Sequence, residues 1–486
     1  MKIIAALCET AHTFCASIRG LSTREKRGNV AAALAHFFLF YLCLQGISMK
    51  MCRAAGAVKP SRLTGGLIAL VTLAALALPA SAEAALSFKS DSECFDADGN
   101  VSSLSDVFSC GKVSGSVRSL YYTTHNAYFA KGFNQDTISY GGFLKYETAP
   151  MYGFNVGVSG LFLRGINHPP EERVISDIGE NQTNIGEAYL NWRYGDFRIT
   201  GGNQRLDLPF VGDYDWRITP ILYQALDMQY GSGDDFLRAT KIWRYKGWGS
   251  DQVKRSTAYT EVTEETDGMW AVGAGRHMMW DDKKLTGQMW YESYADFSNI
   301  FYTEGHLQWQ QALFTPDVAL QYIRGTSEGK ALAGEVDNRS YGAQLSLNFT
   351  PALSWAAGYD HIASSGNSYG YGSLVTPYAH NSSSGPYFAQ PYFTSTQDLG
   401  SGDAYATNVN WNANENLTLG ARYSWMDLTP TMNTGSLRQS EYLVYFIWNF
   451  QGALKGLSLS DFVGVQTSPL YEKDFWQNRL TLQYDF

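Results

Sequence analysis

Along most of the chain, apolar and polar residues alternate one by one. In LTLGARYSW (417–425) the odd-numbered residues are apolar or aromatic, and those between them are polar or small. The segments 341–349 and 285–291 show the same pattern. A period of two, rather than about 3.6, is typical of strands whose two faces meet different surroundings. About eighteen such segments of roughly ten residues can be counted, and that is the length of a tilted transmembrane strand.

The connections between these segments alternate between short and long. The short ones, such as RYGD, WDDKK and NFTPA, contain the Pro, Gly, Asn and Asp of tight turns. The long ones cover residues 164–183, 203–223, 248–266, 324–337 and 362–400. A soluble β-sandwich has no reason to alternate loop length in this way. The sequence therefore predicts an all-β fold, a transmembrane antiparallel β-barrel of about 18 strands with short periplasmic turns and long extracellular loops.

The alternation also predicts which surroundings each face meets. In hydrocarbon every backbone N–H and C=O must be paired, and a closed barrel leaves no unpaired edge. The apolar set should therefore face lipid, while the set rich in Ser, Thr, Asn, Gln and Arg should face a watery lumen. Aromatic residues favour the membrane interfaces. We expect interfacial girdles to include the following residues: Tyr121, Tyr122, Tyr194, Trp425 and Phe486.

The chain ends with RLTLQYDF (479–486), where the alternation runs to the last residue. We expect this segment to be the closing strand of the barrel and to pair with the first strand, 113–122. An ordinary strand explains the alternation but not the terminal aromatic residue. Tyr484 and Phe486 resemble the carboxy-terminal signal that the barrel-assembly machinery recognises.

The front of the chain has the order of a secretory signal. A positive region precedes an apolar core at 67–78 and a cleavage site at 80–82, with 82–84 as a second choice. We predict a signal peptide at 49–82; a membrane anchor is the alternative. A second apolar stretch upstream would be redundant, so 1–48 is either an artefact of the chosen start site or a genuine extension. Residues 83–112 would then form a periplasmic segment before a barrel at 113–486.

Charge and cysteine content narrow the function classes. Removal of residues 1–82 takes nine basic and two acidic residues from totals of 37 and 46, which leaves a net charge of −16. An acidic chain argues against nucleic-acid binding. Only Cys94 and Cys110 remain after cleavage. Export places them in an oxidising compartment, where they either form a disulfide or stay free. No CxxC motif supports zinc, redox or haem chemistry, and no cofactor is expected.

Arginines share the polar face of several predicted strands. Together they could form a positive track along the lumen wall that guides carboxylates, because a guanidinium binds a carboxylate in a bidentate manner. The alternative is that each one pairs with an acidic neighbour such as Glu187 or Asp485. The arginines of this candidate track are Arg118, Arg193, Arg198, Arg238, Arg422 and Arg479.

The connection 203–223 is the strongest candidate for a functional loop. It combines charged residues with Pro and Phe, and a loop of this composition is expected to fold into the lumen, where it would narrow the pore. Pore diameter and fixed charge are what make a channel selective. The alternative is a surface loop packed on other loops. The charged residues of the candidate constriction are Arg205, Asp207, Asp213, Asp215 and Arg217.

Residues 186–226, GEAYLNWRYGDFRITGGNQRLDLPFVGDYDWRITPILYQAL, resemble the OprD-type outer-membrane porins of Gram-negative bacteria. Residues 104–122 are similar to the amino-terminal start of some members. The resemblance implies an eighteen-stranded barrel in the cell outer membrane, an inward third loop, an arginine ladder and selective diffusion of small carboxylates. The resemblance is specific over about forty residues, and over the rest of the chain it concerns only the arrangement of strands and loops. Cys94, Cys110 and the strong acidity depart from the family's pattern, and they leave open whether anions are the preferred cargo.

We therefore expect a passive porin for small hydrophilic solutes such as carboxylates, amino acids or peptides. Its partners would be outer-membrane lipid and the assembly machinery, as a homotrimer or a monomer. One alternative is a sheath for an electron-transfer protein, and another is a barrel enzyme. No histidine lies in a catalytic motif, so an enzyme is not expected. His306 and Glu304 could hold a metal, but a hydrogen-bonded pair on the wall is favoured and no metal is expected.

Overall fold

The computed structural model describes residues 94–166, 170–382 and 385–486. The segments 1–48 and 49–82, for which a start-site artefact and a signal peptide are expected, lie outside these residues, as does the start of 83–112. No helix in the described part of the chain is long and apolar enough to cross a membrane.

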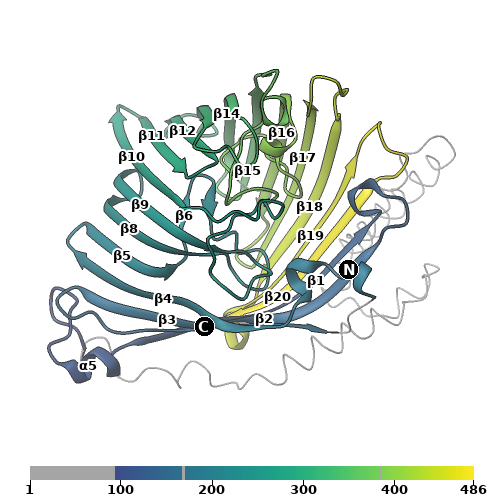
Figure 1. The fold of residues 1–486 in the computed structure, drawn as a ribbon. Coiled ribbons are helices and arrows are strands. Elements are labelled where there is room, and N and C mark those ends of the chain that lie inside the picture. The colour runs from purple at the N-terminus through teal and green to yellow at the C-terminus, as the bar shows by residue number, and fades with distance from the viewer. Residues whose placement is uncertain (1–93, 167–169, 383–384) are drawn as a thin grey trace, which may run out of the picture. The chain divides into compact units, whose positions relative to one another are not determined.

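Eighteen strands form one antiparallel sheet that closes on itself, because β1 pairs with both β2 and β20 (Figure 1). The predicted barrel is confirmed, and so is the pairing of the last segment with the first. The strands of the barrel are β1 (Lys112–His125), β2 (Gln135–Glu147), β3 (Phe154–Ile166), β4 (Gln182–Tyr194), β5 (Phe197–Gln204), β8 (Leu222–Ser232), β9 (Asp235–Lys246), β10 (Met269–Trp280), β11 (Lys283–Tyr294), β12 (Ser298–Trp309), β13 (Asp317–Ser327), β14 (Asp337–Thr350), β15 (Leu353–Ile362), β16 (Ser401–Asn412), β17 (Leu417–Thr429), β18 (Gln439–Asn449), β19 (Leu457–Thr467) and β20 (Phe475–Asp485).

The remaining regular elements are short and lie in the connections or before the barrel. A two-stranded hairpin stands apart from the barrel sheet. These elements are α5 (Leu104–Ser109), η3 (Ala127–Phe129), η4 (Glu171–Arg173), α6 (Ser176–Gly179), β6 (Asp207–Leu208), β7 (Val211–Gly212), η5 (Tyr369–Tyr371), η6 (Thr396–Asp398) and η7 (Gly452–Leu454).

Loop length alternates around the barrel as predicted. The turns 195–196, 233–234 and 351–352 have two residues each, whereas the loop 363–400 at the other end has 38. The end with long loops has one exception, since the connection 295–297 between β11 and β12 contains only three residues. Periplasmic turns are therefore short, and the long extracellular loops are available to fold over or into the barrel.

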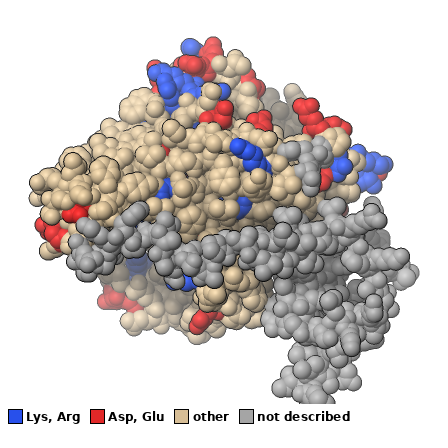
Figure 2. Space-filling view, turned by 90° about the horizontal axis from the view of Figure 1, so that it is seen from below, with Lys and Arg blue, Asp and Glu red and all other residues tan. Residues whose placement is uncertain are grey.

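The outer face of the barrel is apolar. Leu190, Leu237 and Leu320 point outward, with 52%, 60% and 63% of their surface exposed. Figure 2 shows a broad uncharged band on the visible face, where Lys, Arg, Asp and Glu are sparse and gather toward the margins. This band matches the lipid-facing surface of a membrane barrel.

The predicted aromatic girdle needs one correction. Tyr122 faces inward, where its hydroxyl donates to Gln477 at 2.7 Å and its ring lies 4.8 Å below the Arg479 guanidinium. Tyr121 and Tyr122 are consecutive in β1, and successive side chains of a strand point to opposite faces. Only one of the two tyrosines can therefore face lipid.

The inner face is less uniformly polar than the alternation suggests. A large apolar cluster fills part of the interior and joins inward residues of the wall, such as Ile300 and Ile323, to loop residues such as Phe210, Leu374 and Tyr378. Here the inward apolar residues are covered by the chain's own loops, so they do not face water. The expectation of a polar inner face therefore holds only for the part of the wall that the loops leave uncovered.

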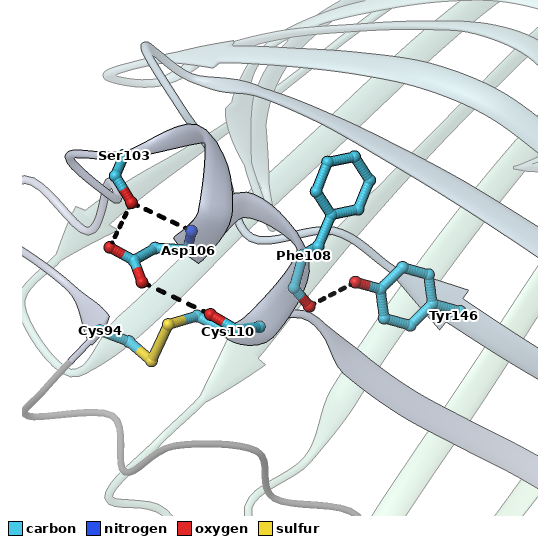
Figure 3. The surroundings of a disulfide bond; sticks show 7 residues. Cys94, Ser103, Asp106, Phe108, Cys110 and Tyr146 are labelled. Carbon is cyan, nitrogen blue, oxygen red and sulfur yellow. Dashed lines mark hydrogen bonds between the residues drawn. A yellow bond between two sulfur atoms is a disulfide. The ribbon is translucent and has the colours of Figure 1, made fainter.

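A small disulfide-bonded segment precedes the barrel (Figure 3). The Sγ atoms of Cys94 and Cys110 are bonded, with their Cα atoms 5.8 Å apart. Between them, Ser103 caps α5, because its hydroxyl oxygen accepts a hydrogen bond from the Asp106 backbone N–H at 3.1 Å. The two cysteines that the sequence left open as paired or free are thus a bonded pair in this structure.

Candidate functional site in the barrel interior

The connection between β5 and β8 lies inside the barrel. The strands extend further than the sequence suggested, so the loop covers 205–221 instead of 203–223. Within it, β6 and β7 form a hairpin whose turn contains Pro209 and Phe210. Phe210 has a φ of 57°, a left-handed conformation that costs a non-glycine residue about 1–3 kcal/mol. Its ring is 1% exposed, so burial compensates for this strain.

The apolar side of this loop contacts the far wall. The Phe210 ring lies 6.4 Å from the Tyr302 ring of β12 and 6.4 Å from the Tyr387 ring of the loop 363–400. Each such edge-to-face pair contributes about 0.5–1.5 kcal/mol beyond its buried area. The loop is therefore packed at its tip and does not extend into solvent.

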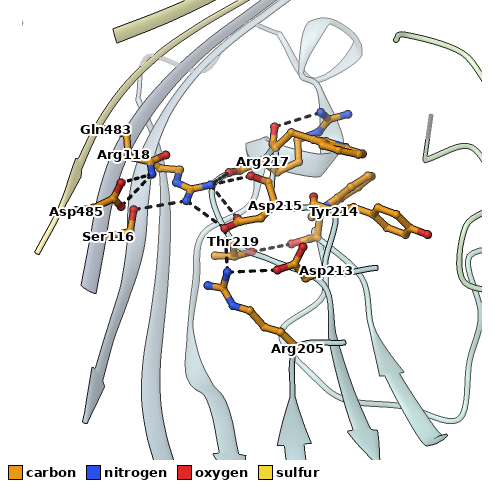
Figure 4. Close-up of polar contacts among 12 residues, drawn as sticks. Ser116, Arg118, Arg205, Asp213, Tyr214, Asp215, Arg217, Thr219, Gln483 and Asp485 are labelled. Atoms are coloured by element: carbon orange, nitrogen blue, oxygen red, sulfur yellow. Dashed lines mark hydrogen bonds and ion pairs between the residues drawn. The ribbon is translucent and has the colours of Figure 1, made fainter. Parts of the chain in front are cut away.

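The charged side of the same loop contacts the opposite part of the wall (Figure 4). Asp215 accepts from Arg118 of β1 at 2.8 Å and from Arg205 at 2.9 Å. Arg205 also lies 3.5 Å from Asp213 and 4.7 Å from the Phe143 ring of β2. One loop carboxylate thus bridges two guanidinium groups, and it ties the loop to the strand that closes the barrel.

Arg217 is held by a different set of groups. Its guanidinium lies 3.2 Å from Asp177 of α6 and stacks on the rings of Tyr122 and Trp248, at 5.3 and 4.8 Å. Its carbonyl accepts from Arg118 at 2.8 Å. Burial lowers the pKa of Arg217, and nearby Arg479 adds to this effect, while Asp177 opposes it. Arg217 therefore fastens the loop to its neighbours and is only 7% exposed.

The two remaining acidic residues of the loop are more accessible. Asp207 is exposed, and its carbonyl accepts from Arg238 of β9 at 2.8 Å. Burial raises the pKa of Asp213, although the neighbouring Arg205 partly offsets that effect. Asp213 therefore takes up a proton more readily than an ordinary aspartate.

Four of the six predicted wall arginines lie beside the loop, because three of them line one cavity with Arg205 and the fourth binds Asp215. Arg193 and Arg198 are directly paired residues of β4 and β5. Arg198 and Arg238 share Asp227, at 3.6 and 2.8 Å. Arg118 is the fourth and binds Asp215, as described above.

Glu187 and Asp485, which the sequence suggested as partners of the wall arginines, contact other side chains. Glu187 lies 3.4 Å from Lys145 and 3.9 Å from Arg205, and Asp485 accepts from Gln483 at 2.7 Å. In the part of the chain that the structure describes, the Arg193 guanidinium makes no hydrogen bond or ion pair. This side of the wall therefore keeps some unpaired positive charge.

Arg422 and Arg479 are covered by a second inward segment, residues 385–394. Arg422 donates to the carbonyls of Phe388 and Gln390, at 3.1 and 2.7 Å. The Arg479 guanidinium stacks on the Phe393 ring at 4.6 Å. These two arginines bind the chain itself, so they do not continue an open track.

Sequence reasoning missed the other side chains that fasten this segment to the wall. Asp360 accepts from the Ala389 N–H at 2.6 Å, and Glu441 accepts from the Tyr392 and Phe393 N–H groups at 2.7 and 3.1 Å. Both carboxylates are at most 1% exposed. The signal that could have revealed them is an acidic residue at an inward position among apolar neighbours, because such a group needs internal donors.

The two inward loops leave neighbouring cavities beside them. A cavity of about 570 Å³ is lined by Phe210, Trp290, Tyr302, Arg238 and Glu304. It adjoins a cavity of about 320 Å³ through Arg238 and one of about 370 Å³ through Glu304, since each residue lines both.

The cavity of about 320 Å³ and the cavity of about 370 Å³ differ in the balance of basic and acidic side chains that line them. The cavity of about 320 Å³ is lined by four arginines and three carboxylates: Arg193, Arg198, Arg205, Arg238, Glu147, Glu187 and Asp227. The cavity of about 370 Å³ has one lysine, one histidine and three carboxylates: Lys284, His306, Asp234, Glu304 and Asp317. A basic region and an acidic region therefore lie on either side of the central, partly aromatic cavity.

His306 lies between two carboxylates in the acidic region. Its Nε2 is 3.0 Å from Glu304, and its Nδ1 is 3.1 Å from Asp317. Both nitrogens can donate only when the ring is an imidazolium. The geometry is that of a hydrogen-bonded pair on the wall. Among the described residues, no group of three or more His, Cys, Asp or Glu is placed to hold a metal ion.

The last residues of the chain lie at the seam of the barrel. Tyr484 pairs with Val117 on the outer face, and its ring lies 5.8 Å from that of Phe486. The Gly115 N–H donates to the Phe486 carbonyl at 2.9 Å. A Cβ on Gly115 would come within 2.5 Å of the Phe486 ring and 2.8 Å of the Phe143 carbonyl, so the close approach requires glycine.

A closed barrel of eighteen antiparallel strands, with charged side chains and two loop segments in its interior, has the architecture of a porin. The family model for outer-membrane porins of the OprD family matches residues 169–486, so the chain belongs to the OprD family. The resemblance seen in the sequence is thereby confirmed, and the members of this family are outer-membrane channels.

Solved structures of porins share the fold. Pseudomonas aeruginosa OpdK, determined with vanillate, is 17% identical, with a TM-score of 0.64 over 77% of this chain and 98% of OpdK. A BenF-like porin from Pseudomonas fluorescens Pf-5 is 14% identical, with a TM-score of 0.67 over 78% of this chain and 99% of that protein. At these identities the likeness concerns the fold alone. Among curated protein sequences, none matches significantly.

Proposed function

We propose that the protein is a passive porin of the outer membrane that selects small carboxylates and zwitterions at a constriction formed by residues 205–221. The supporting observation is the bridge from Arg118 through Asp215 to Arg205. It joins the loop to β1, while Phe210 joins the same loop to β12. When the strand pairings are followed around the barrel, β12 is the ninth strand from β1, so the two lie on opposite sides. A loop fastened at both sides narrows the route that remains.

The charges beside the loop favour solutes with a carboxylate. A solute in the central cavity would have Arg238 at one side and Glu304 at the other, with Trp290 and Tyr302 available to contact an apolar body. A carboxylate would turn toward the basic region and an ammonium group toward the acidic region. Vanillate in the OpdK structure supports a ring-bearing carboxylate as one solute to test.

Neither alternative function has a specific observation in its favour. A sheath for an electron-transfer protein needs a wide interior, whereas residues 205–221 and 385–394 occupy part of this one. The family and the similar structures are porins, which supports transport without catalysis. Assembly by the barrel-assembly machinery, and a trimeric or monomeric state, belong to the same proposal.

Planar-bilayer recordings test the constriction. Deletion of residues 209–217 should raise single-channel conductance and weaken ion selectivity, because both anchors of the loop are removed. Heat-modifiable mobility on gels would show that the barrel still folds. Unchanged conductance and selectivity in a folded deletion variant would refute the assignment of the constriction.

A single-charge comparison tests the bridge itself. Asp215→Asn removes one negative charge from the loop and should move the reversal potential in a salt gradient toward anion preference. Glu472→Gln removes the same charge from an exposed loop residue, 70% exposed, and is the matched control. Equal shifts in the two variants would mean that Asp215 does not act at the narrowest point.

A further inference from the structure

The disulfide-bonded segment 94–111 has no part in the channel interior. Its two ends are joined by the bond between Cys94 and Cys110, and α5 lies between them (Figure 3). Ser103 and Asp106 fix the first turn of that helix, where the Ser103 hydroxyl donates to the Asp106 carboxylate at 2.7 Å. The segment therefore has a defined shape that the transport of solutes does not explain.

Its contacts place it at the outer edge of the barrel, at the end with short turns. Tyr146 lies between Lys145 and Glu147, and Lys145 faces inward because it contacts Glu187. Tyr146 therefore points outward, and its hydroxyl donates to the Phe108 carbonyl at 2.6 Å. Two backbone hydrogen bonds, of 2.8 and 2.9 Å, join 101–107 to the turn between β2 and β3.

The helix presents apolar side chains to its surroundings. Leu104 and Phe108 are 69% and 59% exposed. They are four residues apart, so they lie on the same face of the helix. No residue of α5 is buried, whereas Val101 before it is only 3% exposed. The segment packs on the barrel through Val101, and none of the described residues buries this pair.

The neighbouring barrel surface is an aromatic belt. Tyr152, in the turn that holds the segment, is 80% exposed, and Phe154 is 48% exposed with its ring 5.9 Å from that of Trp192. The Trp192 ring stacks in turn on Tyr194 at 6.2 Å. Aromatic belts of this kind mark the level of the lipid headgroups. Leu104 and Phe108 extend this lipid-facing surface beyond the strands.

We propose that the disulfide-bonded segment is an interfacial membrane anchor, in which Leu104 and Phe108 insert among the phospholipids of the leaflet at the short-turn end of the barrel. A stable protein interface needs about 800 Å² from each partner, far more than two side chains supply. Lipid requires no such minimum, and the barrel already meets lipid beside the segment. The exposed turn 96–99, held by Asp96 through its bond to the Asn100 N–H, remains in water.

Photo-crosslinking tests the lipid contact independently of any transported solute. A diazirine amino acid would replace Leu104 or Phe108 in the full barrel, held in nanodiscs of phosphatidylethanolamine and phosphatidylglycerol. Mass spectrometry would then count lipid adducts. Val156, 42% exposed on the lipid-facing wall, is the positive reference, and Ala97 in the exposed turn is the negative one.

Adduct yields at 104 and 108 should approach the yield at Val156 and exceed the yield at Ala97. Yields no higher than at Ala97 would overturn the proposal, and so would adducts to a protein rather than to lipid when the same variants are irradiated in cells. A Cys94→Ser, Cys110→Ser double variant should label less at 108, with the heat-modifiable mobility of the barrel unchanged. Undiminished labelling would overturn the tethering role of the disulfide.

Discussion

At the scale of single residues, the alternation of polar and apolar positions predicted that the arginines face inward. It did not predict which groups they contact. Arg118 and Arg479 share the polar face of the barrel, as parity predicted, yet one binds the carboxylate of Asp215 and the other stacks on Phe393. Parity depends only on the neighbouring residues of a strand. A partner that belongs to a loop depends on the path of that loop, and no local pattern encodes that path.

Asp213 provides a prediction at this scale. Its pKa is raised above the ordinary 3.8 by burial, so on acidification it should lose its negative charge before an ordinary aspartate does. Reversal potentials of the wild type and of Asp213→Asn should differ at neutral pH and converge as the pH falls. Bilayer recordings over an acidic pH series measure this convergence.

At pH 3.8 the larger share of wild-type Asp213 should already be neutral, like the amide of the variant, because its pKa lies above that value. Curves that stay apart until the pH is below that value would contradict the raised pKa. Glu472→Gln, in an exposed loop, controls for any general response to the loss of one charge.

At the scale of elements, strand number and the alternation of loop length were predictable because both repeat along the chain. The inward folding of 203–223 was predictable in most detail, because charged and apolar residues are mixed so densely there. The sequence of the loop 363–400 did not show which of its residues, here 385–394, would line the wall. That position depends on Asp360 and Glu441, which belong to distant strands.

Glu441 therefore yields a prediction about the second loop. Glu441→Ala would leave the N–H groups of Tyr392 and Phe393 without this acceptor, and for the buried Phe393 N–H the cost is about 1–3 kcal/mol. The segment 385–394 should then detach from the wall, and single-channel conductance should rise. Glu441→Gln retains a carbonyl acceptor and should lie between the wild type and the alanine variant.

Limited proteolysis of the loop provides a second measurement, because a detached segment is cleaved faster. Glu415→Ala changes an exposed carboxylate in the short turn 413–416 and is the matched control. Conductance and cleavage rates that match the wild type in Glu441→Ala would show that the other anchors suffice to hold the loop.

At the scale of the whole molecule, the barrel depends on closure between its first and last strands. β1 and β20 pair from Ser116 with Asp485 to His125 with Trp476. Phe486 lies beyond this ladder, and its carbonyl still accepts from Gly115. Without closure, both strands would expose unpaired backbone groups to hydrocarbon, which costs several kcal/mol for each group.

Phe486 is therefore where assembly can be tested without a change to the channel interior. Deletion of Phe486 should reduce the yield of folded barrel in the outer membrane, while export across the inner membrane continues. The physical reason is that the deletion removes the outward ring beside Tyr484 as well as the last seam contact to Gly115. Heat-modifiable mobility in membrane fractions measures folded barrel, and precursor processing measures export.

Two substitutions separate the ring from the backbone contact at the seam. Phe486→Tyr keeps an aromatic ring and should assemble nearly as well as the wild type, whereas Phe486→Ser keeps the carbonyl bond to Gly115 and should still assemble poorly. Normal yield in Phe486→Ser would show that the backbone contact is sufficient and that the terminal aromatic ring carries no assembly signal. Poor yield in both variants would assign the defect to packing against Gly115, where the ring fits only because that residue lacks a Cβ.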